Sequence, residues 1–291
     1  MFTGTYTALA TPMREGQVDY DSLMKLVEFQ ISAGIGGLVP CGTTGEAATL
    51  SMEERSRVIR TTVDQARRRI PIIAGVGANS TRAAVENGRI AAEAGVDGLL
   101  HVTPYYNKPG AAGLVAHFRA LAAATDLPIL LYNVPGRTGC DMEAPTVAQL
   151  AAESNIVGIK EATGSIVRAQ QIIASCPQDF VLLSGEDTTA LAVTLVGGRG
   201  VISVVANVAP LLMTRMIEHA REGRVEQARE INYRLLPLME MLFMESNPIP
   251  VKAALALAGY GDNDLRLPLV PLSKKKLELV RGELERQGIL P

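Results

Sequence analysis

The chain has 291 residues, with 28 lysines and arginines against 30 acidic residues, and hydrophobic residues make up 47% of it. The formal charge of −2 argues against a nucleic-acid-binding protein, which would carry a basic patch, and no apolar run reaches the ~18 residues that a membrane helix needs. Three widely spaced cysteines fit reduced thiols rather than a disulfide framework, and the N-terminus has no signal-peptide pattern, so we expect a cytoplasmic protein.

Eight short β-rich segments recur along the first part of the chain, and stretches with helical periodicity separate them. Their spacing is that of a strand followed by a crossover helix. The segments are nearly all apolar, as parallel strands buried on both faces should be. They are Thr5–Ala10, Gly37–Pro40, Ile72–Gly75, Gly98–Thr103, Ile129–Asn133, Ile156–Lys160, Phe180–Ser184 and Gly200–Val205.

Helix signals occupy the intervals between these segments. Ser51 and Glu54 have the spacing of a capping box, in which each side chain bonds to the other residue's backbone amide. Gly34 and Gly95 stand where two helices should end before the next strand. Strands that alternate with helices in this way predict a parallel sheet in an α/β protein.

Eight strand-and-helix units predict a (β/α)8 TIM barrel. The alternative is a doubly wound open sheet, which would usually carry a glycine-rich turn after its first strand. Here the first strand ends in Ala10-Thr11-Pro12, which is no such turn, and beyond Pro210 only helical patterns remain. We therefore expect a catalytic barrel over residues 1–220 and a C-terminal helical domain over residues 221–291, packed on the barrel.

Polar residues follow the predicted strands, at the end of the barrel where active sites of this fold lie. The loops there combine hydroxyls, amides, a lysine, an arginine and carboxylates. The segments concerned are Gly42–Glu46, Pro104–Asn107, Tyr132–Gly139, Lys160–Ala162 and Ser184–Asp187.

Lys160 is the one lysine inside a predicted strand, and it follows the apolar residues Ile156–Ile159. Burial disfavours the charged form, so we expect a lowered pKa for this amine. A neutral amine can attack a ketone and form a Schiff base. The alternative is a structural lysine paired with Glu161 or another barrel carboxylate, and the residues alone leave both open.

Three further groups at the same end are candidates for binding or proton transfer. The amides and hydroxyls of Gly42-Thr-Thr-Gly45 can bind a small carboxylate, although an ordinary tight turn has the same glycines. Tyr132 would neighbour Lys160 and could transfer protons, or it could be a core tyrosine. Arg137 suits a second carboxylate, and a surface salt bridge is the alternative.

The histidines form no metal-binding pattern. His101, His117 and His219 lie far apart in the chain, and none belongs to a helical HxxxH pair. We interpret His101, within the fourth predicted strand, as a residue that fills the barrel interior. We therefore expect neither a metal ion nor an organic cofactor.

Five segments make the chain similar to the 4-hydroxy-tetrahydrodipicolinate synthase family, within the wider superfamily of pyruvate-dependent lyases. The resemblance runs from FTGTYTALATPM at the N-terminus to NPIPVKAAL at 247–255, which is nearly the whole chain. The combination of GTTGE with YNVPxRTG is specific within that superfamily, and the arginine of the second motif marks the synthase. The segments are GTTGEAATL at 42–50, VTPYYNKP at 102–109, YNVPGRTGCD at 132–141, GIKEATG at 158–164 and FVLLSGED at 180–187.

The resemblance implies a lyase that condenses pyruvate with L-aspartate 4-semialdehyde. Lys160 would form an imine with pyruvate, and the product would be 4-hydroxy-tetrahydrodipicolinate, an intermediate of lysine and diaminopimelate biosynthesis. Thr44, Tyr132 and Tyr106 would relay protons, and Tyr106 would do so in the active site of a neighbouring subunit. The protein would accordingly be a homo-oligomer, typically a tetramer built as a dimer of dimers.

Substrate-binding residues follow from the same resemblance. Thr43 and Thr44 would hold the pyruvate carboxylate, and Arg137 would hold the carboxylate of the semialdehyde. Gly185 and Ile202 would line the site through backbone groups. Two anionic substrates thus have two separate carboxylate sites.

Members of the family that L-lysine inhibits bind it at the dimer interface through polar side chains. Asn79 and Tyr105 match that pattern, but Met52, Arg55 and Ala83 stand where histidines and a glutamate are usual. Ala83 cannot accept a hydrogen bond from an ammonium group, and Arg55 would repel one. We expect weak or absent inhibition by L-lysine.

Two other functions stay open at this stage. One is another pyruvate Schiff-base aldolase, with Gly136 and His101 reflecting a shifted acceptor pocket. The other is a catalytically silent barrel that only binds a 2-oxo acid or a partner protein, in which Lys160 would be structural. The aldehyde that is accepted would separate the two enzymes, and borohydride trapping with pyruvate would separate either from the silent barrel.

Overall fold

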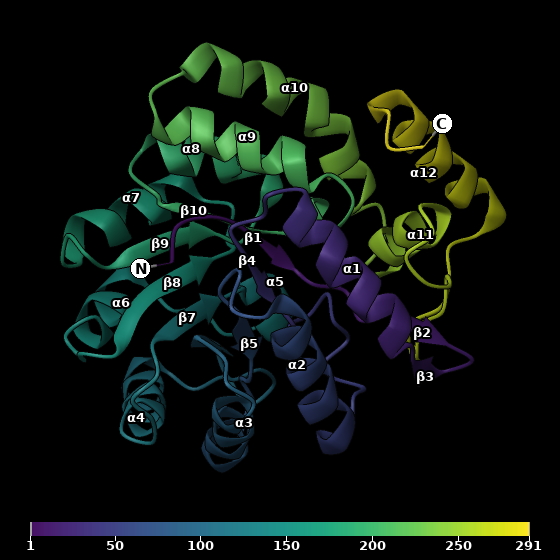
Figure 1. Cartoon of the computed structure of the whole chain (residues 1–291). Helices are drawn as coiled ribbons and strands as arrows, with labels where there is room; N and C mark the ends of the chain where they lie inside the picture. Colours follow the sequence, from purple (N-terminus) through teal and green to yellow (C-terminus); the bar gives the residue numbers. More distant parts are fainter. Residues whose placement is uncertain (1, 291) are drawn as a thin grey trace.

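A closed barrel of eight parallel strands forms the centre of the computed structural model, which describes residues 2–290 (Figure 1). The strands follow the order β4-β1-β10-β9-β8-β7-β6-β5, and a parallel bridge between Leu38 and Ile72 joins the two ends of this row. All eight overlap the segments predicted from the sequence and differ from them only at their ends. They are β1 (Gly4–Ala8), β4 (Gly37–Val39), β5 (Ile73–Gly75), β6 (Gly98–Val102), β7 (Ile129–Asn133), β8 (Ile156–Glu161), β9 (Val181–Ser184) and β10 (Gly200–Ser203).

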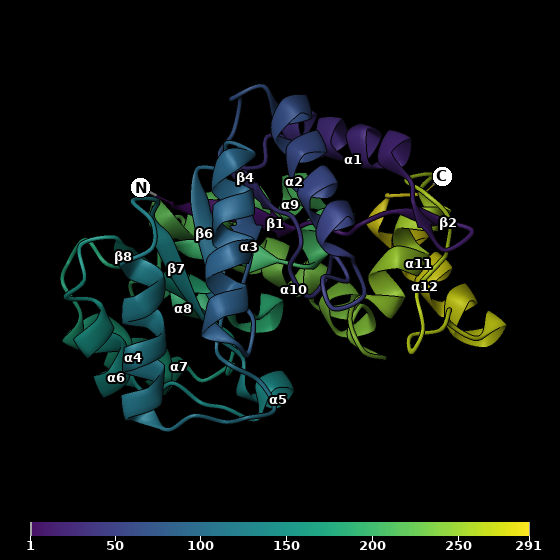
Figure 2. The same cartoon turned by 90° about the horizontal axis from the view of Figure 1, so that it is seen from below.

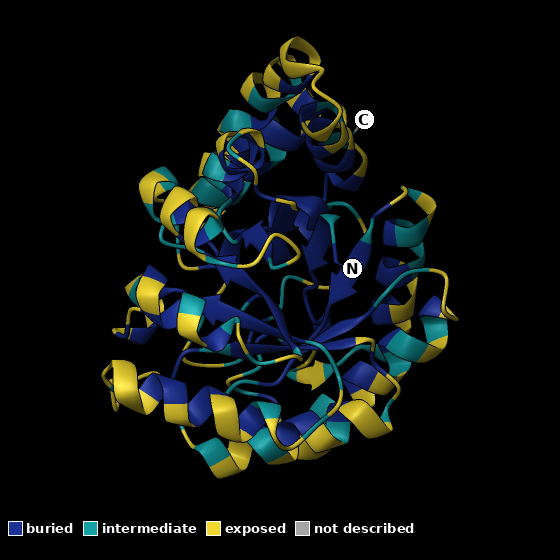
Figure 3. Cartoon of the chain, turned by 90° about the vertical axis from the view of Figure 1, so that its left-hand side faces the viewer, coloured by how far each residue is buried: buried dark blue, intermediate teal, exposed yellow. Residues whose placement is uncertain are grey.

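Helices surround the barrel and turn one apolar stripe toward it, while their outer faces are exposed (Figure 3). The capping box of Ser51 and Glu54 is present at the start of α2, and Gly34 and Gly95 adopt positive φ after α1 and α3, as predicted. The surrounding helices are α1 (Tyr20–Ser32), α2 (Met52–Ala66), α3 (Thr81–Glu93), α4 (Ala111–Ala122), α5 (Pro135–Thr138), α6 (Ala144–Leu150), α7 (Ile166–Ser175), α8 (Ala190–Leu195) and α9 (Pro210–Arg221).

Three further helices, α10 (Val225–Met241), α11 (Ile249–Leu257) and α12 (Lys274–Gln287), follow the barrel. The helix α10 packs along α9, and α12 packs against α10 and α11, so this segment covers one side of the barrel (Figures 1 and 2). The predicted absence of strands after residue 210 is therefore confirmed for the described residues. The division into domains at residue 220 stays a prediction.

A small hairpin was not anticipated from the sequence. Its strands, β2 (Met13–Arg14) and β3 (Gln17–Val18), lie beside the C-terminal segment (Figure 2). The Gly16 amide donates to Asp264 at 2.7 Å, and its carbonyl accepts from Arg266 at 3.0 Å. The hairpin thus connects the start of the chain to the loop that precedes α12.

The barrel strands separate two apolar clusters. Tyr132, Leu183 and Ile202 belong to the cluster inside the barrel, whereas Leu99 and Leu131 belong to the larger one between strands and helices. No helix among the described residues is both long and apolar enough to cross a membrane.

The interpretation of His101 as a residue of the barrel interior is wrong. Its neighbour Leu100 faces the interior, so His101 on β6 points outward toward the helices, near His117 of α4. Its side chain is 1% exposed, and burial lowers the pKa of its imidazole to about 3. His101 therefore cannot shape an acceptor pocket inside the barrel.

We expect His101→Met to reduce the loss of stability in acid. The pKa of His101 is about 3 in the folded protein against 6.5 for a free imidazole, so the unfolded chain binds more protons between these values. Stability is therefore lost as the pH falls from about 6.5 toward 3. Urea unfolding midpoints measured between pH 7.5 and 5 should fall less steeply in the variant. A His219→Gln variant controls for the loss of a histidine as such, and an unchanged slope in His101→Met would contradict the assignment.

Candidate active site

Lys160 and Tyr132 lie side by side on neighbouring strands. They are register partners in the pairing of β7 with β8, and Lys160 Nζ lies 4.4 Å from the centroid of the Tyr132 ring. Both side chains are buried, at 6% and 8% exposure. The predicted strand neighbourhood of the two residues is confirmed.

The structure does not support the alternative in which Lys160 is ion-paired. Glu161, the next residue on β8, points the other way: its carboxylate accepts from the amide of Asn133 at 3.1 Å and from the Thr163 backbone at 2.7 Å. Burial raises the pKa of this carboxyl group. Among residues 2–290 no carboxylate forms a salt bridge with Lys160, so its amine is held by strand position and packing.

Gly185 leaves room for the lysine stem. A Cβ atom at this position would lie 3.0 Å from both Cγ and Cε of Lys160 and 2.6 Å from the Ala162 side chain. A residue larger than glycine would therefore displace the amine. A close approach, rather than a turn conformation, accounts for the glycine here, and the prediction that its backbone lines the substrate site stays a prediction.

Hydroxyl groups of the turn at residues 42–46 lie at the mouth of the barrel. Thr43 lines a cavity of about 420 Å³, whereas Thr44 is 2% exposed and its hydroxyl accepts from the Asn247 amide at 2.9 Å. Cys41, just before this turn, and Glu46, its last residue, adopt positive φ. The backbone is therefore sharply bent around the two threonines.

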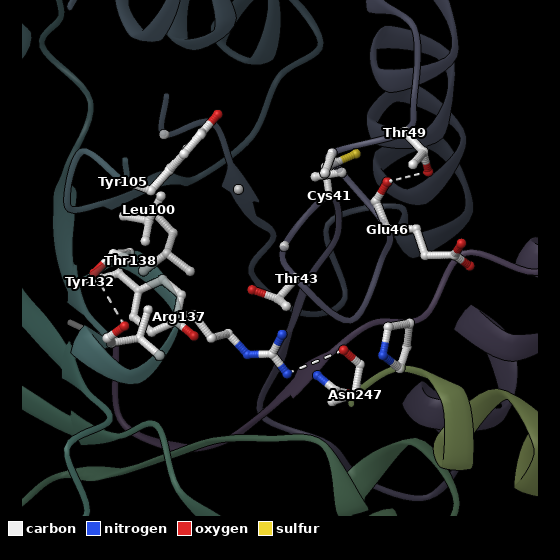
Figure 4. A pocket seen from close by; sticks show the side chains of 18 of the residues that line it. Cys41, Thr43, Glu46, Thr49, Leu100, Tyr105, Tyr132, Arg137, Thr138 and Asn247 are labelled. Atoms are coloured by element: carbon white, nitrogen blue, oxygen red, sulfur yellow. Dashed lines mark hydrogen bonds between the residues drawn. The ribbon is translucent and has the colours of Figure 1, made fainter. Parts of the chain in front are cut away.

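Arg137 lies across the same cavity, on the short helix α5 (Figure 4). Its Nη2 donates to the backbone carbonyl of Asn247 at 3.2 Å. It forms no salt bridge with a carboxylate of residues 2–290, which removes the alternative of a surface ion pair. A guanidinium that lines a cavity and lacks an acidic partner can bind an anionic ligand.

The structure gathers most of the predicted residues but not Tyr106. Thr43, Tyr132 and Arg137 line the cavity, while Thr44, Lys160, Gly185 and Ile202 adjoin these residues without lining it. Tyr106 is 89% exposed and does not line the cavity of its own chain, whereas the adjacent Tyr105 does.

Sequence reasoning missed a buried ion pair beside the threonine turn. Lys252 of α11 pairs with Glu46, and both side chains are 2% exposed. The second oxygen of Glu46 accepts from the Arg266 backbone at 3.1 Å, and the Arg266 guanidinium pairs in turn with Glu54. The available signal was a single lysine within the apolar stretch IPVKAALALA, which indicates a buried cation that needs a partner.

Asn247 is the second residue that was missed. It precedes α11, is 5% exposed, and bonds to both Thr44 and Arg137. No local pattern distinguishes it, because both partners lie more than a hundred positions away in the chain.

Five positions were compared above with members of the family that L-lysine inhibits. These positions lie on α2, on α3 and in the loops before α3 and α4; they are Met52, Arg55, Ala83, Asn79 and Tyr105. Arg55 donates to the carbonyls of Gly75 and Ala47 at 3.1 and 3.0 Å and lines the cavity. Met52 is 46% exposed, and Ala83 is exposed. The positively charged Arg55 guanidinium therefore lies at this edge of the cavity.

Comparisons with known proteins all find similarity to the same family over nearly the whole chain. Residues 1–287 match the model of the dihydrodipicolinate synthetase family. A 4-hydroxy-tetrahydrodipicolinate synthase from Pseudomonas savastanoi pv. phaseolicola is 52% identical over 291 residues, covering 100% of both chains. One from Maridesulfovibrio salexigens is 47% identical over 290 residues and 99% of both chains.

Solved structures of this family also superpose on the chain along its whole length. Dihydrodipicolinate synthase from Thermotoga maritima superposes with a TM-score of 0.98 at 43% identity, covering 100% of both chains. The chloride-inhibited dihydrodipicolinate synthase from Acinetobacter baumannii, complexed with pyruvate, has a TM-score of 0.98 at 47% identity, again over 100% of both chains. The barrel with its C-terminal helices is the fold of these proteins.

We expect Lys252→Met to lower the free energy of unfolding by about 3–5 kcal/mol, because it leaves the Glu46 carboxylate buried without its partner. The double variant Glu46→Gln/Lys252→Met should recover part of this loss, since it removes both charges. Denaturant unfolding of the wild type, both single variants and the double variant measures the difference. Strictly additive losses would show that the two residues do not interact.

Proposed function

Because the chain belongs to the dihydrodipicolinate synthetase family, we propose that it condenses pyruvate with L-aspartate 4-semialdehyde through an imine on Lys160. The enzyme is a lyase, and its family acts in lysine and diaminopimelate biosynthesis. The observation that carries the proposed mechanism is Lys160 itself. Its amine is buried beside Tyr132 at the end of a barrel strand and has no carboxylate partner among residues 2–290.

The reaction begins with attack of the Lys160 amine on C2 of pyruvate, which releases water and forms the imine. The protonated imine nitrogen withdraws electrons, so the methyl group loses a proton and an enamine results. The enamine carbon adds to the aldehyde carbon of the semialdehyde. The substrate's amino group then attacks the imine carbon and displaces the lysine, which yields the cyclic 4-hydroxy-tetrahydrodipicolinate with net loss of one water.

Two regions of the mouth are suited to the two carboxylates. The turn that carries Thr43 and Thr44 offers hydroxyls and amides for pyruvate, and Arg137 across the cavity offers a guanidinium for the semialdehyde. Tyr132, next to the amine, is placed to transfer protons during imine formation. Gly185, directly after β9, lies against the lysine stem, and we propose that its backbone and that of Ile202 on β10 line the substrate site.

Tyr106 can take part in the proposed proton relay only when subunits associate. The resemblance to the family implies that Tyr106 acts in the site of a neighbouring subunit, and its side chain, 89% exposed and outside the cavity of its own chain, is compatible with that role. On the same resemblance we propose a homo-oligomer, a tetramer built as a dimer of dimers. The predicted location in the cytoplasm is proposed with it.

We expect Lys160→Ala to abolish turnover and imine formation together. The assay mixes the protein with pyruvate and L-aspartate 4-semialdehyde and follows NADPH oxidation by added dihydrodipicolinate reductase. Borohydride treatment with pyruvate should add mass to the wild type at Lys160 and to no site in the variant. A variant with near wild-type rate would refute the mechanism. Trapped pyruvate without NADPH oxidation in the wild type would instead indicate an aldolase for another aldehyde.

Arg137→Ala should weaken use of the semialdehyde while pyruvate trapping is largely retained. Loss of a charge-assisted hydrogen bond costs about 1.5–3 kcal/mol, which corresponds to a rise in the KM for semialdehyde of roughly ten- to a hundredfold. Initial rates at varied semialdehyde and saturating pyruvate measure this effect. Loss of imine formation instead would show that Arg137 serves the first substrate.

We expect weak or absent inhibition by L-lysine. Arg55 lines the edge of the cavity and repels an ammonium group, and Ala83 offers no side-chain acceptor. Initial rates with added L-lysine test this expectation. Half-inhibition at submillimolar lysine would contradict it.

A further inference from the structure

Asn133 and Glu161 form a buried contact directly behind the pair of Tyr132 and Lys160. They follow these two residues on β7 and β8, and they are the next register partners in the same ladder. Side chains alternate along a strand, so this second pair faces the surrounding helices while the first faces the barrel interior. Both residues are buried, and the mechanism proposed above uses neither of them.

One side-chain hydrogen bond joins the ends of the two strands. The amide nitrogen of Asn133 donates to one carboxylate oxygen of Glu161 at 3.1 Å, and the other oxygen accepts from the Thr163 backbone amide at 2.7 Å. Both partners are donors, so the carboxylate fits this arrangement in its ionised form. The side chain of Glu161 therefore holds the end of β8 to β7 and to the loop that follows β8.

The backbone of Glu161 extends the same connection toward the lysine stem. Its carbonyl accepts from the amide of Gly185 at 2.7 Å. Gly185 is the residue at which a Cβ atom would lie 3.0 Å from both Cγ and Cε of Lys160. A displacement of Glu161 would thus move Lys160, which precedes it in the chain, together with Gly185, which confines the lysine stem.

The position of Lys160 depends on these strand ends because no charged partner fixes it. It forms no salt bridge with a carboxylate of residues 2–290, and its amine lies 4.4 Å from the centroid of the Tyr132 ring. The register of β7 with β8 sets this placement. An imine forms only when the amine meets the carbonyl carbon at the right distance and angle, and a misplacement of about 1 Å can cost roughly a hundredfold in rate.

Asn133 also closes the loop that carries Arg137. Its amide nitrogen donates to Asp141 at 2.8 Å, and its side-chain oxygen accepts from the Met142 backbone at 3.0 Å. A change at Asn133 therefore affects two parts of the site. A change at Glu161 affects the lysine side alone, so Glu161 is the residue on which a test should be built.

We propose that Glu161 is a positioning residue for imine formation: its bond to Asn133 on the outer face of the barrel wall holds the Lys160 amine in place on the inner face. The proposal rests on the imine-forming role given to Lys160 above. It assigns Glu161 no contact with the substrate. The effect falls on the rate of the first step rather than on pyruvate binding, because the groups suited to the pyruvate carboxylate lie in the turn at residues 42–46.

The test measures imine formation alone. Protein is mixed with pyruvate at several concentrations, borohydride stops the reaction at set times, and the intact mass gives the trapped fraction. The limiting rate constant reports imine formation, and its dependence on concentration reports pyruvate binding. We expect Glu161→Gln to lower the rate constant roughly tenfold and to change pyruvate binding less than about twofold, since the glutamine oxygen satisfies only one of the two donors.

Asn155→Ala is the matched control at the opposite end of the same strand. Asn155 directly precedes β8, and its side-chain amide donates to the carbonyls of Ala122 and Thr125 at 3.0 and 2.8 Å. The variant loses hydrogen bonds that hold β8, as Glu161→Gln does, but it loses them far from the amine. We expect it to keep the wild-type rate constant.

A bond of reversed polarity provides a second comparison. Asn133→Asp places a carboxylate against Glu161 and should lower the rate constant more than Glu161→Gln does, because two like charges then face each other. Adding Glu161→Gln to this variant restores a donor opposite an acceptor, so the double variant should recover part of the loss. Denaturant unfolding shows whether each variant is folded under the assay conditions, and Glu161→Gln carries the test if Asn133→Asp is not.

A wild-type rate constant in Glu161→Gln would overturn the proposal. An equal loss in Asn155→Ala would also overturn it, because the effect would then follow stability rather than position. Weaker pyruvate binding with an unchanged rate constant would assign Glu161 to binding instead. If the wild type itself forms no trapped adduct, the proposed function fails and this inference with it, so the two failures are distinguishable.

Discussion

All eight strands of the closed barrel run in one direction, and this single constraint brings the site together. Parallel strands end at the same rim, so residues that lie far apart in the chain meet there. The register of β7 with β8 then places Tyr132 directly beside Lys160. The register also fixes Gly185, after β9, as the small neighbour that the lysine stem requires. Neither the amine nor the phenol is held in place by an ion pair, because strand geometry already positions both.

The protein buries two lysines, one with a carboxylate partner and one without. Lys252 is paired with Glu46, and the pair ties the C-terminal helices to the threonine turn. Lys160 has no such partner within residues 2–290 and faces the ring of Tyr132 instead. A buried cation with a carboxylate stabilises an arrangement of segments, whereas an amine without one remains available for chemistry. The contrast separates Lys252, which joins two segments of the fold, from Lys160, for which the Schiff-base role is proposed.

The helices after the barrel also contribute to the site. Asn247, Lys252 and Arg266 all reach the turn at residues 42–46 or the start of α2, and Asn247 also touches Arg137. The mouth of the barrel is thus enclosed by loops from its own strands and by the segment that precedes and begins α11. This arrangement couples the shape of the cavity to the docking of the C-terminal helices.

The sequence by itself determined the features that depend on local pattern. Apolar strands, the capping box at Ser51 and the polar residues after each strand all follow from neighbours in the chain, and they sufficed to predict the barrel, the helical C-terminal region and the pairing of Tyr132 with Lys160. Strands buried on both faces show no alternation of polarity, so the sequence could not tell which face His101 occupies, and the prediction for it was wrong. Only the tertiary structure decided that Asn247 meets Thr44 and that Lys252 meets Glu46. These partners are separated by 203 and 206 positions, and contacts over such distances arise from how the C-terminal helices pack on the barrel, which no local pattern encodes.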